Sequence, residues 1–214
     1  MKIVHILAKS KLDIDIPKEV LEQIPPNLGV VTSIQHLGKV RDIAQQIKGR
    51  LAGQVLGCRT ESANRFVESV DGYLFIGTGR FHPIAVALST RKEVWCYNPV
   101  NKQLSKIAKD EIDGFVRHRK AAIVNFFAAK RIGILVSTKS GQNLFKKALD
   151  FKENRKDDGK EYYIFAFETL FLPWLEHFPF VQCWVNTACP RIADDTSGIA
   201  NIDDIVQFEK DGEF

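Results

Sequence analysis

Four cysteines carry the most telling chemistry in this chain: Cys58, Cys96, Cys183 and Cys189. A cysteine thiolate is both a nucleophile and a ligand for soft metals. None of the four belongs to a C-x-x-C pair, and this excludes a zinc ribbon or a ferredoxin-type run. A metal centre would therefore have to be assembled from distant parts of the chain.

Cys58 closes the run Gly53-Gln54-Val55-Leu56-Gly57-Cys58. The two glycines allow a sharp turn, and helical spacing begins soon after the cysteine. Helix-end N–H groups and the neighbouring Arg59 would both stabilise a thiolate at this position. The alternative is that Cys58 is a small buried apolar residue, which is the commoner role of a lone cysteine.

The other three cysteines differ in their surroundings. Cys183 and Cys189 fall in one expected strand, about 20 Å apart if it is extended, so both cannot bind one small centre. Cys189 lies at the carboxyl end of that strand, in Ala188-Cys189-Pro190-Arg191, and is the better candidate ligand. Cys183 and Cys96 each stand beside a tryptophan and are expected in the core.

Two loops bring small and polar residues to expected helix starts. Gly77-Thr78-Gly79 begins like a dinucleotide-binding fingerprint, but His82 stands where the third glycine belongs, so the pattern fails. The loop Ser137-Thr138-Lys139-Ser140-Gly141-Gln142 offers hydroxyls, a lysine and N–H donors without Walker A spacing. Either loop suits a small polar or anionic ligand at a helix N-terminus. His82 could be a ligand or base there, or could simply cap or pack.

Strands and helices are expected to alternate along the chain. Nearly continuous apolar strands indicate parallel sheets covered on both faces, with ligands at the carboxyl ends of the strands. We therefore expect an α/β protein of two consecutive domains, each a mainly parallel sheet flanked by helices, with a site between them. The boundary is expected where a long helix ends, so that residues 1–129 carry Cys58 and residues 130–214 carry Cys189. The expected strands are 1–9, 29–34, 51–56, 73–77, 93–97, 131–137, 162–167 and 180–187; the expected helices are 35–47, 62–70, one starting at 82, 112–130, 143–151 and 168–177.

The charge pattern argues against nucleic-acid binding. The net charge is +4, and the 30 basic residues are scattered among 26 acidic ones, so no basic stripe forms. The densest basic cluster, Arg117-His118-Arg119-Lys120, is expected at a helix start as a solvated face, with anion binding as the alternative. The acidic tail from Ala193 shows no strong periodicity and is expected to pack loosely or fray.

Apolar runs are too short for a membrane segment. None approaches the roughly 20 residues that span a bilayer, and the apolar core near the N-terminus is too short for a signal peptide. Four cysteines without an export signal favour a reducing compartment, so disulfides are not expected. The expected location is the cytoplasm.

Four motifs, taken in order, resemble those of the diphthamide synthase family, the 2-(3-amino-3-carboxypropyl)histidine synthases of archaea and eukaryotes. The resemblance extends from about Met1 to Asp195. In this chain Met1 falls near the start of the family's second domain, so the resemblance covers the second and third domains and the first is absent. The motifs are Gly53–Cys58, Phe75-Ile76-Gly77-Thr78-Gly79-Arg80-Phe81-His82-Pro83, Gly133–Gln142 and Ala188–Arg191.

The resemblance implies a non-standard radical enzyme. Members of the family have three similar α/β domains, each giving one cysteine to a 4Fe-4S cluster that binds S-adenosylmethionine. The reduced cluster releases a 3-amino-3-carboxypropyl radical, which adds to a histidine of translation elongation factor 2. By the matching motifs, Cys58 and Cys189 would be metal ligands. The residues that would line the cofactor site are Gly77, Thr78, Gly79, His82, Ser137, Thr138, Lys139 and Gln142.

Two departures from the family pattern shape what is expected of this chain. The cysteine of the first domain has no counterpart, so a third thiolate would come from a first-domain polypeptide or a second subunit, and an electron donor protein would also be required. Asn98-Pro99-Val100 stands where the family has Asp-Pro and an aromatic residue. The alternatives are a non-catalytic paralogue acting as a binding module and a different small-molecule enzyme on the same scaffold.

Overall fold

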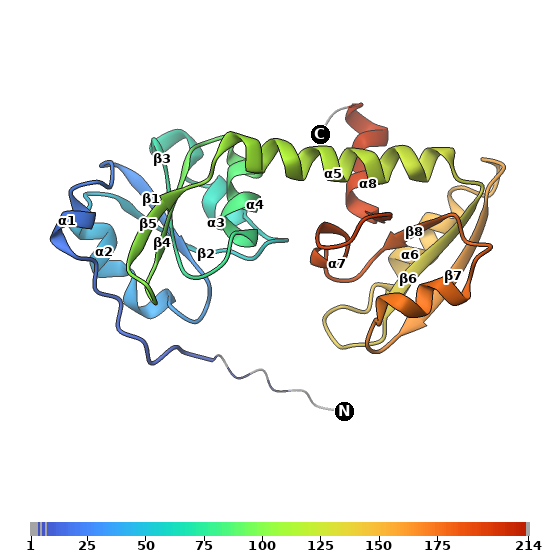
Figure 1. Cartoon of the computed structure of the whole chain (residues 1–214), viewed down its shortest axis with the longest axis horizontal. Helices are drawn as coiled ribbons and strands as arrows, with labels where there is room; N and C mark the ends of the chain where they lie inside the picture. The colour runs from blue at the N-terminus through green and yellow to red at the C-terminus, as the bar shows by residue number, and fades with distance from the viewer. Residues whose placement is uncertain (1–3, 5, 7, 213–214) are drawn as a thin grey trace. The chain divides into compact units, whose positions relative to one another are not determined.

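The computed structural model describes residues 4, 6 and 8–212 and divides into two compact units, residues 1–112 and 113–214. Each unit is a mainly parallel sheet flanked by helices (Figure 1), which confirms the expected α/β class. The division lies inside helix α5 (Lys109–Ala128) rather than after residue 129. The reason is that Ala122, Ile123 and Phe126 of this helix belong to the core of the second unit.

The first unit contains a five-stranded sheet with strand order β2-β1-β3-β4-β5. The first four strands run parallel, so their carboxyl ends meet at one edge. Strand β5 pairs antiparallel to β4. The strands are β1 (Leu28–Thr32), β2 (Arg50–Gln54), β3 (Gly72–Ile76), β4 (Val94–Asn98) and β5 (Gln103–Lys106), and the helices are α1 (Lys18–Leu21), η1 (Leu37–Lys39), α2 (Arg41–Gln46), α3 (Glu61–Asn64), η2 (Val67–Ser69) and α4 (Phe81–Thr90).

Both faces of this sheet are covered. Alternate residues of a strand point to opposite faces, and Leu74 and Ile76 of β3 pack with Ile43 and Ala44 of α2 on one of them. On the other face, Tyr73, which precedes Leu74, is fully buried and donates a hydrogen bond from its hydroxyl to the carbonyl of Ala63 in α3, at 2.8 Å. Because both faces are buried, the strands appear in the sequence as continuous apolar runs.

Four expectations for the first unit need correction. The expected helices 35–47 and 62–70 are each two short pieces, η1 with α2 and α3 with η2. Strand β5 was not expected because Gln103–Lys106 has few apolar residues. The expected strand 1–9 lies partly outside the described residues, and its described positions are not in a strand. There Val4 and Ile6 are exposed, since no neighbouring strand pairs with them in the described part of the chain.

The second unit contains a four-stranded, fully parallel sheet with strand order β7-β6-β8-β9. Its central strand β6 alternates between two cores: Ile132, Ile134 and Val136 face α5, α6 and α8, while Leu135 faces the other side with Ala193. The strands are β6 (Arg131–Ser137), β7 (Glu161–Phe167), β8 (Cys183–Asn186) and β9 (Ile199–Asn201), and the remaining helices are α6 (Phe145–Glu153), η3 (Leu172–His177), α7 (Arg191–Asp194) and α8 (Ile202–Asp211).

The expectation that the tail from Ala193 packs loosely is wrong. Residues 199–201 form strand β9, and Ile202 and Ile205 of α8 are almost fully buried in the core. Apolar side chains at i and i+3 place both on one helix face, a pattern that the many acidic residues of the tail obscure. Among the described residues, no helix is both long and apolar enough to span a bilayer.

Candidate functional site

Cys58 lies at the tip of a tight turn that follows the carboxyl end of β2. The backbone N–H of Leu56 donates to the carbonyl of Arg59 at 2.9 Å, and the N–H of Arg59 donates back at 3.1 Å. Gly57 and Cys58 are therefore the two central residues of the turn. The Cys58 side chain is exposed, so the thiol is open to a metal or an electrophile.

Gly57 is required at this turn by close packing. A Cβ atom added there would lie 1.8 Å from Cε1 of Phe81 and 2.3 Å from its Cζ, far inside van der Waals contact. Phe81 is the first residue of α4. The turn that presents Cys58 is thus fixed against the start of a second helix of the same unit.

The Gly77–His82 loop follows the carboxyl end of β3 and borders a pocket of about 440 Å³. Gly77 and Gly79 line this pocket together with Arg80, Cys96 and Asn98. Thr78 and His82 are not among its lining residues. The His82 ring instead stacks on Phe75, with ring centroids 5.9 Å apart, and meets the edge of Phe81.

Arg80 ties this loop to the following elements. Its guanidinium binds both carboxylate oxygens of Glu111 at 3.0 and 2.5 Å, and it donates to the Ser105 hydroxyl and the Lys106 carbonyl, each at 2.9 Å. The hydrogen bond from Arg80 lowers the pKa of Glu111 below its ordinary value. Arg80 therefore connects the loop to β5 and α5, and its guanidinium is already paired with a carboxylate.

Cys189 follows the carboxyl end of β8 in the second unit. Its thiol is half-buried and borders a pocket of about 400 Å³. Lys139 and Gln142 line the same pocket, so three of the residues singled out from the sequence meet there. Ser137 and Thr138 instead shape the loop: the Ser137 hydroxyl accepts from the N–H of Lys139 at 3.2 Å, and the Thr138 hydroxyl donates to the Phe167 carbonyl at 3.2 Å.

The two remaining cysteines are buried, as expected. Burial raises the pKa of the Cys96 thiol to about 11 and that of Cys183 to about 12. The two side chains are only 6% and 1% exposed, so little of either thiol can be reached from solvent. The structure therefore separates two accessible cysteines, each beyond the carboxyl end of a strand, from two that belong to the core.

The basic cluster at residues 117–120 differs from what was expected. It lies in the middle of α5, and Arg119 is not solvated: its side chain is only 21% exposed. Arg119 binds both carboxylate oxygens of Asp194 in α7 at 3.0 and 3.2 Å and reaches Asp204 in α8 at 3.2 Å. The exposed Arg117 on the same helix does fit a solvated face.

Asn186, a buried residue close to Cys189, is not among the candidates singled out from the sequence. Its side-chain oxygen accepts from the N–H of Ala188 at 3.0 Å, and its side-chain nitrogen donates to the carbonyl of Cys189 at 2.9 Å. An asparagine that closes an apolar strand, three residues before a cysteine, is the pattern that would have pointed to it.

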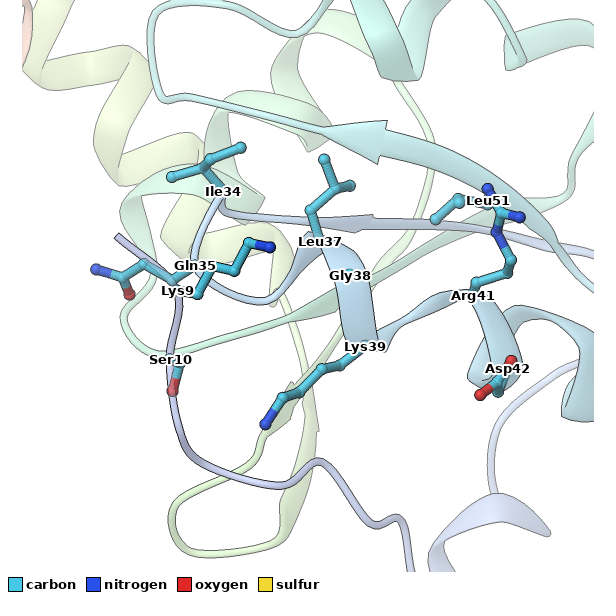
Figure 2. Close-up of a pocket in the computed structure, with 10 residues that line it drawn as sticks. All are labelled: Lys9, Ser10, Ile34, Gln35, Leu37, Gly38, Lys39, Arg41, Asp42 and Leu51. Carbon is cyan, nitrogen blue, oxygen red and sulfur yellow. The ribbon is translucent and has the colours of Figure 1, made fainter. Parts of the chain in front are cut away.

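A further pocket of about 660 Å³ in the first unit was also not expected (Figure 2). Lys9, Lys39 and Arg41 line it, yet Figure 2 shows the Lys39 amine and the Arg41 guanidinium pointing in different directions. The Lys39 amine binds the carbonyl of Leu12 at 2.7 Å and the carboxylate of Asp13 at 3.0 Å. These cations do not converge on one point, so the pocket has no defined anion site.

No group of three or more histidine, cysteine, aspartate or glutamate side chains within residues 4, 6 and 8–212 could hold a metal ion. The two accessible thiols nevertheless suit an iron–sulfur cluster, whose usual ligands are cysteine thiolates. Cys58 and Cys189, the two candidate thiols, lie in two different units.

Comparisons with known proteins agree with the motifs. The family model described as "Putative diphthamide synthesis protein" matches residues 1–209. A 2-(3-amino-3-carboxypropyl)histidine synthase from Methanocaldococcus jannaschii is 31% identical over 185 residues, covering 86% of this chain and 48% of the relative. One from Pyrococcus horikoshii is 32% identical over 203 residues, covering 84% and 57%. The chain thus spans about half the length of these curated relatives.

Solved structures resemble the chain as well. The crystal structure of Dph2 from Pyrococcus horikoshii with a 4Fe-4S cluster superposes with a TM-score of 0.80 at 26% identity, covering 96% of this chain and 65% of that one. A second structure of Dph2 from the same organism gives a TM-score of 0.71 at 28% identity, covering 86% and 57%. The family match over almost the whole sequence, together with these relatives, shows that the chain belongs to the diphthamide synthesis protein family.

Proposed function

We propose that this chain is part of a diphthamide synthase that transfers a 3-amino-3-carboxypropyl group from S-adenosylmethionine to a histidine of translation elongation factor 2 in the cytoplasm. In this proposal Cys58 and Cys189 are two of the three protein ligands of a 4Fe-4S cluster. The unit that carries Cys58 and the unit that carries Cys189 would correspond to the second and third domains of the family.

One observation carries the proposal: Cys58 is exposed and Cys189 half-buried, whereas the other two cysteines are buried, and each of these two follows the carboxyl end of a parallel strand. This is the edge at which open parallel sheets bind ligands. Cys96 and Cys183 are buried, at 6% and 1% exposed, and are therefore the weaker candidates. The Dph2 structure that resembles the chain contains a 4Fe-4S cluster.

The third thiolate comes from outside the residues described here, either from a further part of the polypeptide or from a partner subunit. A cluster held by Cys58, Cys189 and this third thiolate would supply one-electron reduction of S-adenosylmethionine, with the electron coming from a donor protein. In the second unit, the Lys139 ammonium and the Gln142 amide line the pocket beside Cys189. We assign them to the carboxylate of the bound cofactor, since an ammonium and an amide N–H are the donors that a carboxylate accepts.

In the first unit, Gly77 and Gly79 leave the backbone open to close approach by the same cofactor. His82, Ser137 and Thr138 are proposed to shape the two loops rather than to bind through their side chains, whereas the exposed Thr78 stays a proposed cofactor contact. This follows from their contacts: His82 stacks on Phe75, and the hydroxyls of Ser137 and Thr138 bond to backbone groups. Asn98 lines the first pocket and accepts from the N–H of Val100 at 2.9 Å.

The test is anaerobic purification of the chain alone and together with a polypeptide that carries the first domain of the family. Iron, acid-labile sulfide and visible absorption are measured for both samples. We expect iron and a broad visible band only with the partner. With S-adenosylmethionine and a reductant, the reconstituted sample should then modify elongation factor 2, and the modified histidine is detected by peptide mass spectrometry.

A second candidate function is a paralogue that binds elongation factor 2 or a partner without transferring the group. The lack of three clustered ligands in the described residues favours it. It predicts no iron in either sample and unchanged partner binding in a Cys58→Ala variant. Iron that depends on the partner and on Cys58 would exclude this alternative.

A further inference from the structure

The segment that carries Cys189 cannot hold its own conformation. It consists of Ala188–Asp194, here called the Cys189 segment, in which α7 makes up only four residues. A helix this short is unstable by itself. Its geometry must therefore come from the groups around it.

Asn186 brackets the cysteine on both sides. The side chain is only 1% exposed, and its oxygen accepts from the N–H of Ala188 while its nitrogen donates to the carbonyl of Cys189. The same nitrogen also donates to the side-chain oxygen of Asn201 at 2.8 Å. The buried Asn186 amide thus binds the N–H of the residue before Cys189 and the carbonyl of Cys189 itself. It is in turn anchored to Asn201 of β9.

The rest of the Cys189 segment is fixed by neighbouring elements. The Asn201 side-chain nitrogen lies 3.4 Å from the carbonyl of Pro190, and the His118 ring nitrogen lies 2.9 Å from the carbonyl of Ala193. Asp194, whose side chain is 2% exposed, is held by the Arg119 guanidinium. These contacts hold the segment beyond the cysteine, whereas Asn186 acts at the cysteine itself.

The neighbouring Thr187 shows that this arrangement is specific to Asn186. Thr187 is also buried, at 2% exposed, and its hydroxyl donates to the carbonyl of Leu135 at 2.8 Å. That bond stabilises the pairing of β8 with β6 and does not reach the Cys189 segment. Two adjacent buried polar residues therefore serve different purposes.

We propose that Asn186 is a positioning residue that sets the backbone at Cys189 and so aims its thiol into the pocket that it shares with Lys139 and Gln142. The orientation of the thiol matters for function only if Cys189 is a cluster ligand, so this inference rests on the proposed function. The positioning itself is a property of the metal-free chain and can be measured without any cluster.

The experiment measures iodoacetamide alkylation of each cysteine in the full-length, metal-free chain by peptide mass spectrometry, with Cys58 as the internal reference. Asn186→Leu replaces the amide by an apolar group of similar size, and Thr187→Val is the matched control. We expect Asn186→Leu to raise the Cys189 rate relative to Cys58 by about tenfold, since one or two buried hydrogen bonds that limit local opening are lost. Thr187→Val should leave the ratio within about twofold of wild type.

The inference is wrong if Asn186→Leu lowers the thermal midpoint as Thr187→Val does but leaves the alkylation ratio unchanged. Should Asn186→Leu fail to fold, Asn201→Ala removes the anchor of the Asn186 amide and should raise the same ratio in the same direction. No change in that variant would equally overturn the inference. Failure of the proposed function is a separate result, because it appears as iron binding that does not depend on Cys189.

Discussion

The two cysteine-bearing loops reach similar positions by different means. Cys58 is presented by a two-residue turn with backbone hydrogen bonds on either side, and this turn is fixed by the contact of Gly57 with Phe81. Cys189 is presented by an irregular segment that buried polar side chains hold through its backbone. One loop depends on shape and the other on hydrogen bonds and charge.

This difference predicts how each loop fails. A packed turn is sensitive to added volume and insensitive to pH or salt, because dispersion and steric contacts carry no charge. A buried polar network is sensitive to the loss of any one member, since its partners are left unsatisfied away from water.

The largest effect is expected from Arg119→Ala. It leaves Asp194 and Asp204 without their shared cation while both remain buried, and breaking such a pair costs about 3–5 kcal/mol. The contact between the Arg119 guanidinium and the Phe115 ring, 4.5 Å away, is also lost. Hydrogen exchange should show faster opening of peptides from α7 and α8, with no change around Cys58.

The exposed Arg117 on the same helix provides the matched control. Arg117→Ala should change stability by no more than about 0.5 kcal/mol, as is usual for an exposed residue. Equal effects of the two substitutions would mean that the ion pairs of Arg119 do not stabilise the Cys189 segment.

A smaller effect is expected from Gly57→Ala. The new methyl group would meet the Phe81 ring, and such overpacking costs about 1–3 kcal/mol. The Cys58 turn should open and the exchange of its amides should rise, with the second unit unaffected. Gly38→Ala is the control, because a Cβ there has open space around it.

The double variant Gly57→Ala with Phe81→Ala sharpens this prediction. Removing the ring makes room for the methyl group. The double variant should therefore lose less free energy of unfolding than the sum of the losses in the two single variants. Strict additivity would show that Gly57 is needed for some reason other than the contact with Phe81.

The smallest effect concerns pH. Burial raises the pKa of Asp204 above its ordinary value of 3.8, so the folded unit retains a proton that the unfolded chain has already lost. The stability that this proton contributes is fully present below the pKa of Asp204 in the unfolded chain. It is lost as the pH rises through the higher pKa of Asp204 in the folded chain. Asp204→Asn should flatten that part of the pH profile of urea unfolding of the second unit, whereas an unchanged slope would contradict the assignment.

Much of the fold could be predicted from the sequence. Continuous apolar strands such as 131–137 indicate a parallel sheet covered on both faces, and the structure confirms this. Strand β5 could not be predicted in this way, because an edge strand such as Gln103–Lys106 buries little and carries no apolar pattern. The tail was misjudged because its acidic residues hide the spacing of Ile202 and Ile205.

The candidate site was only partly accessible from sequence. Cys58, Cys189 and the glycine loops stand in local motifs, so their types and spacing could be recognised. Arg119 and Asn186 act through partners brought together by folding: Arg119 meets Asp194 across 75 positions of the chain. No local pattern distinguishes Arg119 from the solvated Arg117 two positions earlier.

The proposed ligand set can be tested by measuring the iron bound by four variants, Cys58→Ala, Cys96→Ala, Cys183→Ala and Cys189→Ala, each purified anaerobically with a polypeptide that carries the first domain of the family. We expect iron and visible absorption to fall by about tenfold or more without Cys58 or Cys189, since each supplies a cluster ligand. The variants at Cys96 and Cys183 should retain iron near the wild-type level, even if they are less stable. The proposed ligand set would be contradicted if the Cys58→Ala and Cys189→Ala variants both kept their iron, or if iron were lost only in the Cys96→Ala or Cys183→Ala variant.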